Sequence, residues 1–172
     1  PLSRRGGADG VTTPGTAAAR DAHRARREGL SRALAASRGT TVGLAKDTSN
    51  LFRDRDDAGR RLLDVREFDH VIAVHTDAGE VEAEGMATYD TIVEATLAAG
   101  AMPAVVPQLR TITLGGAAAG VGIEATSFRE GLVHETLTAI DVLTGTGDIV
   151  TCRPDNEHAD LFHGFPNSYG TL

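Results

Sequence analysis

The chain lacks tryptophan, has a single cysteine, and takes only 4% of its 172 residues from the aromatic types. Its core must therefore be built mainly from Val, Leu, Ile and Ala. Cys152 has no second cysteine with which to form an internal disulfide bond, which is compatible with a reducing compartment, and we expect a cytoplasmic protein. No apolar run approaches the ~20 residues of a membrane-spanning helix, so no transmembrane segment is expected.

Lysine is also nearly absent, because 16 of the 17 basic residues are Arg. Residues 1–66 hold 14 basic residues against 8 acidic ones, whereas residues 67–172 hold 3 against 16. Such asymmetry can mark a nucleic-acid-binding arm, which would here use Arg24, Arg26 and Arg27. The basic residues are interleaved with Ala, Asp and Glu, and no aromatic residue lies among them to stack on bases. We therefore favour a solvated helix and expect no nucleic-acid partner.

Hydrophobic periodicity and turn residues predict an α+β fold with frequent hairpins and antiparallel pairing. Residues 1–16 are expected to form a flexible arm, and residues 17–37 an Arg- and Ala-rich helix that Gly39 stops. The charged segment 51–66 is predicted to be a surface loop. The remaining expected elements are strands at 41–45, 68–74, 81–85, 102–106, 137–143 and 149–152, and helices at 88–99 and from 159.

The segment 107–127 places four glycines in eight positions after a strand-like alternation. Ordered glycine costs conformational entropy, and one reason for such a cluster is a turn whose backbone lies against a large anionic ligand. A P-loop nearly fails, since Val121 stands where a Lys must follow Gly120. A Rossmann turn matches Gly120–Ala125, with Asp141 as the ribose-binding acid, but the strand and helix that should flank it are not evident. A turn whose glycines serve only packing is a further alternative.

Four segments, in this order, resemble the FAD-binding (PCMH-type) domain of the vanillyl-alcohol-oxidase / p-cresol-methylhydroxylase flavoprotein superfamily. The likeness is greatest to the delta(24)-sterol reductase branch, where a GTGIES-type segment corresponds to GVGIEA here, and it covers about residues 40–172. The segments are Lys46–Arg53, Val105–Gln108, Thr111–Ser127, and Asp160–Phe162 together with Ser168–Leu172.

The resemblance implies an α+β domain of two lobes with mixed or antiparallel sheets, at residues 39–172, preceded by the arm and helix of residues 1–38. Lobe one would cover about residues 41–107 and lobe two about residues 111–172, with FAD between them. Because the chain stops at Leu172, where a strand would be expected to continue, we expect a C-terminally truncated fragment without the family's substrate domain.

The resemblance also implies which residues bind FAD. The turn 46–50 offers main-chain N–H groups, two hydroxyls and one cation to the pyrophosphate. The glycines would admit the pyrophosphate and ribityl, Thr113 and Ser127 would supply hydroxyls, and the backbone of Ile149 would lie near the adenine. The expected FAD-binding residues are Lys46, Thr48, Ser49, Asn50, Pro107, Thr113, Gly115, Gly116, Gly120, Gly122, Ile123, Glu124, Ser127 and Ile149.

Many members of this superfamily carry a His in the pyrophosphate turn that bonds covalently to the flavin. The turn 46–50 contains neither His nor Cys, so FAD is expected to be held non-covalently. The implied function is that of a flavin-dependent oxidoreductase that transfers hydride through flavin N5. Its small-molecule or lipid-like substrate would be bound by a separate C-terminal domain, so no catalytic residue is named here. A degenerate domain that binds nothing is an alternative.

The remaining candidate residues give weaker signals. His158 and His163 lie near Cys152, but their spacing fits no closed zinc pattern, and no metal is expected. Cys152 has no partner base in the sequence and is predicted to be buried. His134 follows the glycine segment and could face the flavin, although a core or loop position is favoured.

Overall fold

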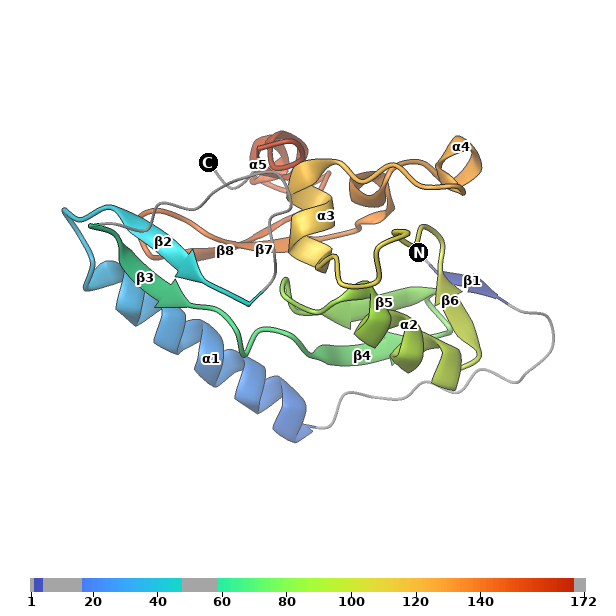
Figure 1. Cartoon of the computed structure of the whole chain (residues 1–172), viewed down its shortest axis with the longest axis horizontal. Coiled ribbons are helices and arrows are strands. Elements are labelled where there is room, and N and C mark those ends of the chain that lie inside the picture. The colour runs from blue at the N-terminus through green and yellow to red at the C-terminus, as the bar shows by residue number, and fades with distance from the viewer. Residues whose placement is uncertain (1, 5–16, 48–58, 169–172) are drawn as a thin grey trace.

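The computed structural model describes residues 2–4, 17–47 and 59–168 (Figure 1). Its helices are α1 (Ala17–Ala35), α2 (Tyr89–Ala98), α3 (Leu114–Gly120), α4 (Ser127–Glu130) and α5 (Ala159–Gly164), with a 3-10 helix, η1 (Val133–Thr136). Its strands are β1 (Leu2–Arg4), β2 (Val42–Ala45), β3 (Arg61–Asp64), β4 (Val71–His75), β5 (Glu80–Ala83), β6 (Ala101–Pro103), β7 (Ile140–Leu143) and β8 (Ile149–Cys152). This mixture of helices and short strands confirms the predicted α+β class.

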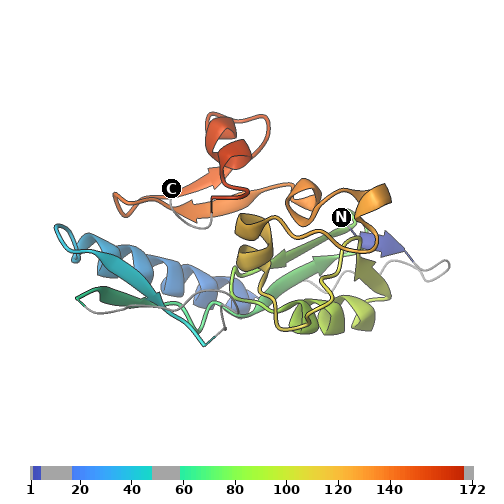
Figure 2. The ribbon, with the colours of Figure 1, turned by 45° about the horizontal axis from the view of Figure 1, so that its top comes forward.

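The strands that the structure describes associate in pairs. β4 with β5, β7 with β8, and β1 with β6 are antiparallel, whereas β2 and β3 are parallel. Gly79 and Gly147 sit in the turns of the two hairpins with positive φ angles of 68° and 94°, a conformation that glycine adopts without steric cost. The mixed and antiparallel pairing is therefore as predicted. In Figure 2 the β7–β8 hairpin and α5 form one layer above another that holds α1, α2 and β2 to β5.

Two segments differ from the prediction. The loop expected at 51–66 is wrong for its final part, because Arg61–Asp64 forms β3; residues 51–58 lie outside the described residues. Leu63 is buried there, and the β3 backbone pairs in register with β2, which outweighs the charged composition of the segment. The arm expected at 1–16 is likewise wrong for Leu2–Arg4, whose backbone pairs with β6.

Helix α1 ends at Ala35, close to the predicted end of the helix, and Gly39 adopts the left-handed φ of 81° expected of a helix stop. The buried Ser37 continues the turn by donating its hydroxyl to the carbonyl of Ala33 at 2.7 Å. None of the described helices is long and apolar enough to cross a membrane.

A small apolar core joins α2 and α3. It consists of Tyr89, Val105, Ala117 and Val133, with Val106, Ile112 and Leu114 packed against it. Thr88 and Thr113, the residues that precede α2 and α3, form an antiparallel bridge with each other. The core and the bridge together fix the start of α3 against the start of α2, which positions the glycine-rich segment.

Candidate functional site

The glycine-rich segment forms helix α3 instead of the ligand-binding turn that its composition predicted. Thr113 has an extended backbone, and its Oγ1 accepts the N–H of Gly116 at 3.2 Å, which caps the helix. The three consecutive alanines favour a helix, and Ala117 and Ala118 are buried. The helix ends at Gly120 because Val121 takes the left-handed conformation, with φ of 56°.

Three of the four glycines lie in close contact with other parts of the chain. Gly115 donates its N–H to the carbonyl of Gly85 at 2.8 Å, and a Cβ at Gly115 would lie only 2.9 Å from that oxygen. A Cβ at Gly116 would lie 2.9 Å from Thr113 Oγ1, and one at Gly122 would lie 3.0 Å from Val133 Cγ2. Close packing within the chain therefore accounts for the presence of glycine at these three positions, and the glycine cluster is not by itself evidence of a ligand.

The segment after α3 is tied to the loop after β6. Glu124 Oε2 accepts the N–H of Gln108 at 3.1 Å, and Ser127 Oγ accepts the N–H of Glu124 at 3.0 Å. Thr126 donates its hydroxyl to the carbonyl of Ala104 at 2.8 Å. Ile123 lies between these anchors with 71% of its surface exposed. The predicted residues of the 107–127 region thus lie together, with one large apolar side chain facing outward.

Tyr89, the first residue of α2, packs against this region, and the sequence analysis did not identify it as part of the site. It is 4% exposed and packs with Ala117 of α3 in the core. Burial, together with the negative charge of Glu124, raises the pKa of Tyr89 to about 12, so the phenol stays neutral at physiological pH. The only sequence signal was the Thr-Tyr-Asp run, which predicted a helix start and gave no reason to place Tyr89 near Glu124.

Two other predicted FAD-binding residues, Lys46 and Ile149, lie at different strand pairs. Lys46 directly follows β2, and Ile149 is the first residue of β8. Thr48, Ser49 and Asn50 lie outside the described residues. The structure groups Pro107, Thr113, Gly115, Gly116, Gly120, Gly122, Ile123, Glu124 and Ser127 around α3 and the loops that flank it.

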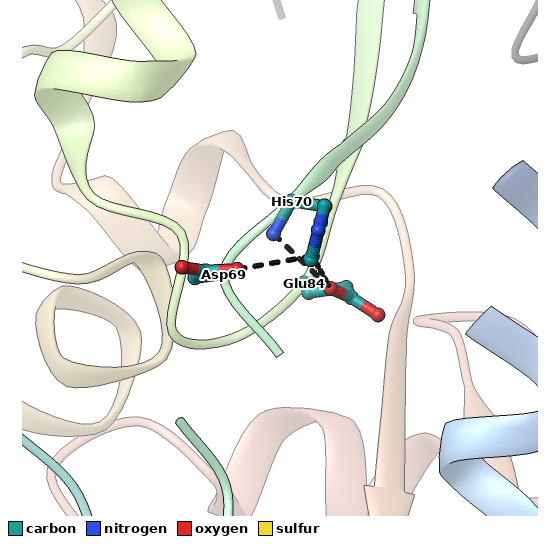
Figure 3. Close-up of side chains that lie close together, drawn as sticks. All are labelled: Asp69, His70 and Glu84. Carbon is teal, nitrogen blue, oxygen red and sulfur yellow. Dashed lines mark hydrogen bonds and ion pairs between the residues drawn. The ribbon is translucent and has the colours of Figure 1, made fainter. Parts of the chain in front are cut away.

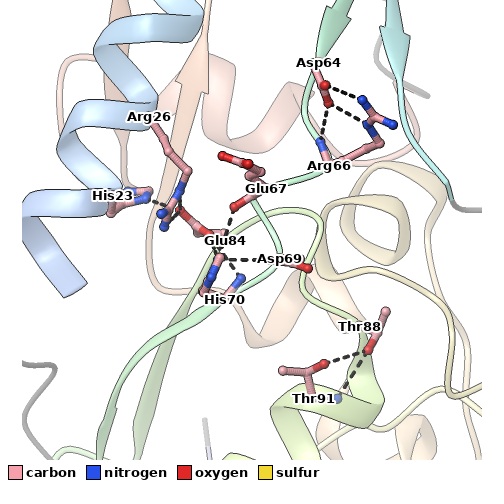
Figure 4. Close-up of polar contacts among 10 residues, drawn as sticks. All are labelled: His23, Arg26, Asp64, Arg66, Glu67, Asp69, His70, Glu84, Thr88 and Thr91. Atoms are coloured by element: carbon pink, nitrogen blue, oxygen red, sulfur yellow. Dashed lines mark hydrogen bonds and ion pairs between the residues drawn. The ribbon is translucent and has the colours of Figure 1, made fainter.

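A second polar cluster, also missed by the sequence analysis, surrounds Glu84 (Figure 4). The Glu84 side chain is fully buried, and its Oε1 lies 2.6 Å from His23 Nδ1 and 2.7 Å from Arg26 Nη2. Its Oε2 accepts the backbone N–H of His70 at 3.1 Å and lies 3.0 Å from the ring Nδ1 of His70. Burial alone would raise the pKa of Glu84, but the hydrogen bonds from His23, Arg26 and His70 outweigh it, and the pKa is lowered.

Part of this cluster has the composition of a metal site, because one ligand atom from each of Asp69, His70 and Glu84 lies within 4.8 Å of the others (Figure 3). His70 Nδ1 lies 3.0 Å from both carboxylates. The positive guanidinium of Arg26 already neutralises the buried carboxylate of Glu84, so a metal ion there would have to be bound beside a fixed cation. We therefore interpret the cluster as a salt-bridged connection between α1 and the β4–β5 hairpin.

Three further candidates from the sequence have clear positions. Cys152 is buried as predicted, and burial, together with the charge of Asp141, raises the pKa of its thiol. Asp141, the ribose acid of the Rossmann alternative, instead pairs with Arg27 at 2.9 Å and lies on an antiparallel hairpin. His134 is partly buried, and its Nδ1 has no hydrogen-bond partner among the described residues.

The chain is similar to known proteins over most of its length. Residues 30–153 match the model of a family described as FAD binding domain. The Delta(24)-sterol reductase of Arabidopsis thaliana is 32% identical over 110 residues, 64% of this chain and 20% of the relative. Cytokinin dehydrogenase 7 of Oryza sativa subsp. japonica is 38% identical over 82 residues, 48% of this chain and 16% of the relative.

The fold has a solved counterpart in 6-hydroxy-D-nicotine oxidase from Arthrobacter nicotinovorans, with a TM-score of 0.67 and 19% identity over 79% of this chain and 30% of that chain. The chain spans about a fifth of the length of the curated relatives. The family match covers α3, its flanking loops and the β7–β8 hairpin, and no comparison supports the Rossmann alternative. The chain therefore belongs to the FAD binding domain family, as its resemblance to the vanillyl-alcohol-oxidase superfamily predicted, and FAD is its cofactor.

Proposed function

We propose that this chain is the FAD-binding portion of a flavin-dependent oxidoreductase and that it holds FAD non-covalently. The observation that carries the proposal is the family match over residues 30–153, which includes the whole region around α3. The FAD would lie between a first lobe, about residues 41–107, and a second lobe, about residues 111–172. The absence of His and Cys from the turn 46–50 supports non-covalent binding.

The chemistry of the residues around α3 fits this cofactor. The hydroxyls of Thr113 and Ser127 each accept a backbone N–H, so each keeps its own proton to donate to a phosphate or ribityl oxygen. The exposed Ile123 offers an apolar surface to the flavin ring system. Lys46 and the hydroxyls of Thr48 and Ser49, with Asn50, would serve the pyrophosphate.

When bound, FAD supplies the redox chemistry by accepting or giving a hydride at N5, and the protein binds and orients it. The relatives named as sterol reductases support a small-molecule or lipid-like substrate. In our proposal, a further domain binds this substrate and supplies the catalytic residues. Arg26 and Arg27 are engaged by Glu84 and Asp141, which supports our prediction of no nucleic-acid partner. A cytoplasmic location is supported by the lone Cys152.

The test is an absorbance titration of the purified protein with FAD, followed by acid denaturation. We expect flavin bands that travel with the native protein and appear as free FAD in the supernatant after acid precipitation. Flavin that stays with the precipitated protein would contradict non-covalent binding. A protein that takes up no FAD would overturn the proposal, and uptake of NAD in its place would restore the Rossmann alternative.

A further inference from the structure

Helix α1 contacts two hairpins that are far apart in the sequence. Towards the β4–β5 hairpin, His23 and Arg26 bind the buried Glu84, and Arg20 lies 3.5 Å from Glu82. Figure 4 shows His23 and Arg26 reaching from α1 to Glu84. This end of α1 is therefore held to the first hairpin by charge-assisted hydrogen bonds.

The second half of α1 contacts the β7–β8 hairpin. Arg27 Nη1 lies 2.9 Å from Asp141 Oδ2, and Ser31 donates its hydroxyl to the carbonyl of Gly147 in the hairpin turn. Gly147 lies so close to α1 that a Cβ there would be in van der Waals contact with Ala35, at 3.6 Å. One helix thus bonds to both hairpins, which belong to separate sheets.

The side-chain bonds that α1 makes to the two hairpins are ion pairs and hydrogen bonds. No residue of α1, all of which the structure describes, is fully buried, so the helix has no deep apolar anchor. The helix carries five arginines against Asp21 and Glu28, whereas residues 67–172 hold 3 basic and 16 acidic residues. The attraction between a basic helix and an acidic body therefore contributes to the attachment of α1, with Glu84 as its buried centre.

We infer that α1 is an electrostatic strap that holds the β4–β5 and β7–β8 hairpins at a fixed spacing and thereby strengthens FAD binding. The inference rests on the proposed function, in which these hairpins belong to the two lobes on either side of FAD. None of the proposed FAD-binding residues lies on α1, so the strap acts by positioning. When the two lobes are already joined, the protein loses less conformational freedom as a ligand binds to both of them, and the ligand binds more tightly.

The test compares two charge reversals on the same helix. Arg27→Asp breaks the pair with Asp141 and puts two acids together, whereas Arg24→Asp removes only an exposed pair with Asp21 within α1. The dissociation constant for FAD is measured by flavin fluorescence, under conditions where urea unfolding shows each variant to be folded. We expect Arg27→Asp to raise this constant about fivefold or more, the lower range of typical coupling between sites, and Arg24→Asp to change it less than about twofold.

Two further measurements separate positioning from a general loss of structure. Adding Asp141→Arg to Arg27→Asp restores the opposite charges and should recover FAD affinity. Because coupling is reciprocal, FAD should also slow hydrogen exchange at the α1 amides of the unmodified protein. If Arg27→Asp does not fold, Ser31→Ala, which removes the bond to Gly147, takes its place with the same expected direction.

The outcomes distinguish the two proposals. An unmodified protein that binds no FAD overturns the proposed function, and the strap with it. If the unmodified protein binds FAD and Arg27→Asp binds it as tightly as Arg24→Asp does, the strap inference is wrong while the proposed function stands. Weaker binding by Arg27→Asp that the added Asp141→Arg restores supports the strap.

Discussion

At the scale of single residues, a glycine of α3 and a glycine of α1 show that the same residue type can be needed in one place and replaceable in another. Gly115 lies against the backbone of Gly85, where even a methyl group would collide with a carbonyl oxygen. Gly29, in the middle of α1, has no atom within 4 Å of the place where its Cβ would be. The first position requires glycine for steric reasons, and the second does not.

Gly115→Ala should therefore destabilise the protein by roughly 1–3 kcal/mol, because the backbone of α3 must move away from Gly85. Gly29→Ala is the matched control, and it should stabilise the protein by about 0.5–1 kcal/mol through the better helix propensity of alanine. Urea unfolding measures both changes. A Gly115→Ala variant as stable as the unmodified protein would show that α3 is not packed against Gly85.

Glu84 predicts a specific dependence of stability on pH. Its pKa in the folded protein is lower than its ordinary 4.5, so the unfolded chain binds more protons in the acid range. Its stabilising contribution is complete above about pH 4.5 and is lost as the pH falls through the lowered pKa. Glu84→Gln should remove this part of the acid sensitivity, and at neutral pH it should lower the free energy of unfolding by roughly 3 kcal/mol.

Urea unfolding at a series of pH values between 3 and 7 provides the measurement. Glu82→Gln is a suitable control, since Glu82 is half exposed and lies 3.5 Å from Arg20. Equal acid sensitivity in the Glu84→Gln and unmodified proteins would mean that the carboxylate of Glu84 is not held in its charged form by His23, Arg26 and His70.

At the scale of elements, α2 and α3 begin in the same way. Thr88 Oγ1 accepts the N–H of Thr91 at 3.3 Å, and Thr113 Oγ1 accepts the N–H of Gly116 at 3.2 Å. Both threonines have an extended backbone, and the two pair with each other. Only Thr113 belongs to the proposed FAD site, so the pair separates capping from cofactor binding.

Thr88→Ala and Thr113→Ala should each lower the free energy of unfolding by about 1 kcal/mol, the usual cost of losing a helix cap. Only Thr113→Ala should also weaken FAD binding, by roughly fivefold to tenfold, because it removes a hydroxyl donor from the cofactor. Urea unfolding and flavin fluorescence titration measure the two effects separately. Equal FAD affinity in both variants would remove Thr113 from the site.

At the scale of the whole molecule, the pairs of strands are joined by α1, by the core around Tyr89 and by the bridge before α2 and α3. A ligand that binds only the folded state should add to the stability of such an arrangement. FAD at about 100 times its dissociation constant should raise the free energy of unfolding by roughly 2.7 kcal/mol, and NAD at the same concentration should not. Thermal unfolding with each nucleotide tests this, and stabilisation by NAD alone would contradict the cofactor assignment.

Local sequence signals determined most of the elements, because caps, turns and alternating apolar residues act over a few positions. Thr88 begins a helix, Gly39 and Gly100 adopt the left-handed φ expected after helices, and the 145–148 turn joins β7 to β8. Strand ends differ by up to three residues from the prediction, since pairing with a distant strand decides them. The family was likewise predicted from the sequence, through the resemblance of four segments, in order, to its FAD-binding domain.

Tertiary structure alone decided which residues meet. Arg61–Asp64 became a strand because β2 offers a partner, although its charges predicted a loop. Glycine content predicted a ligand-binding turn within 107–127, but a threonine cap and burial of Ala117 and Ala118 made Leu114–Gly120 a helix. The cluster around Glu84 joins residues up to 61 positions apart, and only the folded chain brings His23 to that carboxylate. Local propensity fixes elements over a few residues, whereas burial and charge pairing depend on contacts that the sequence order does not contain.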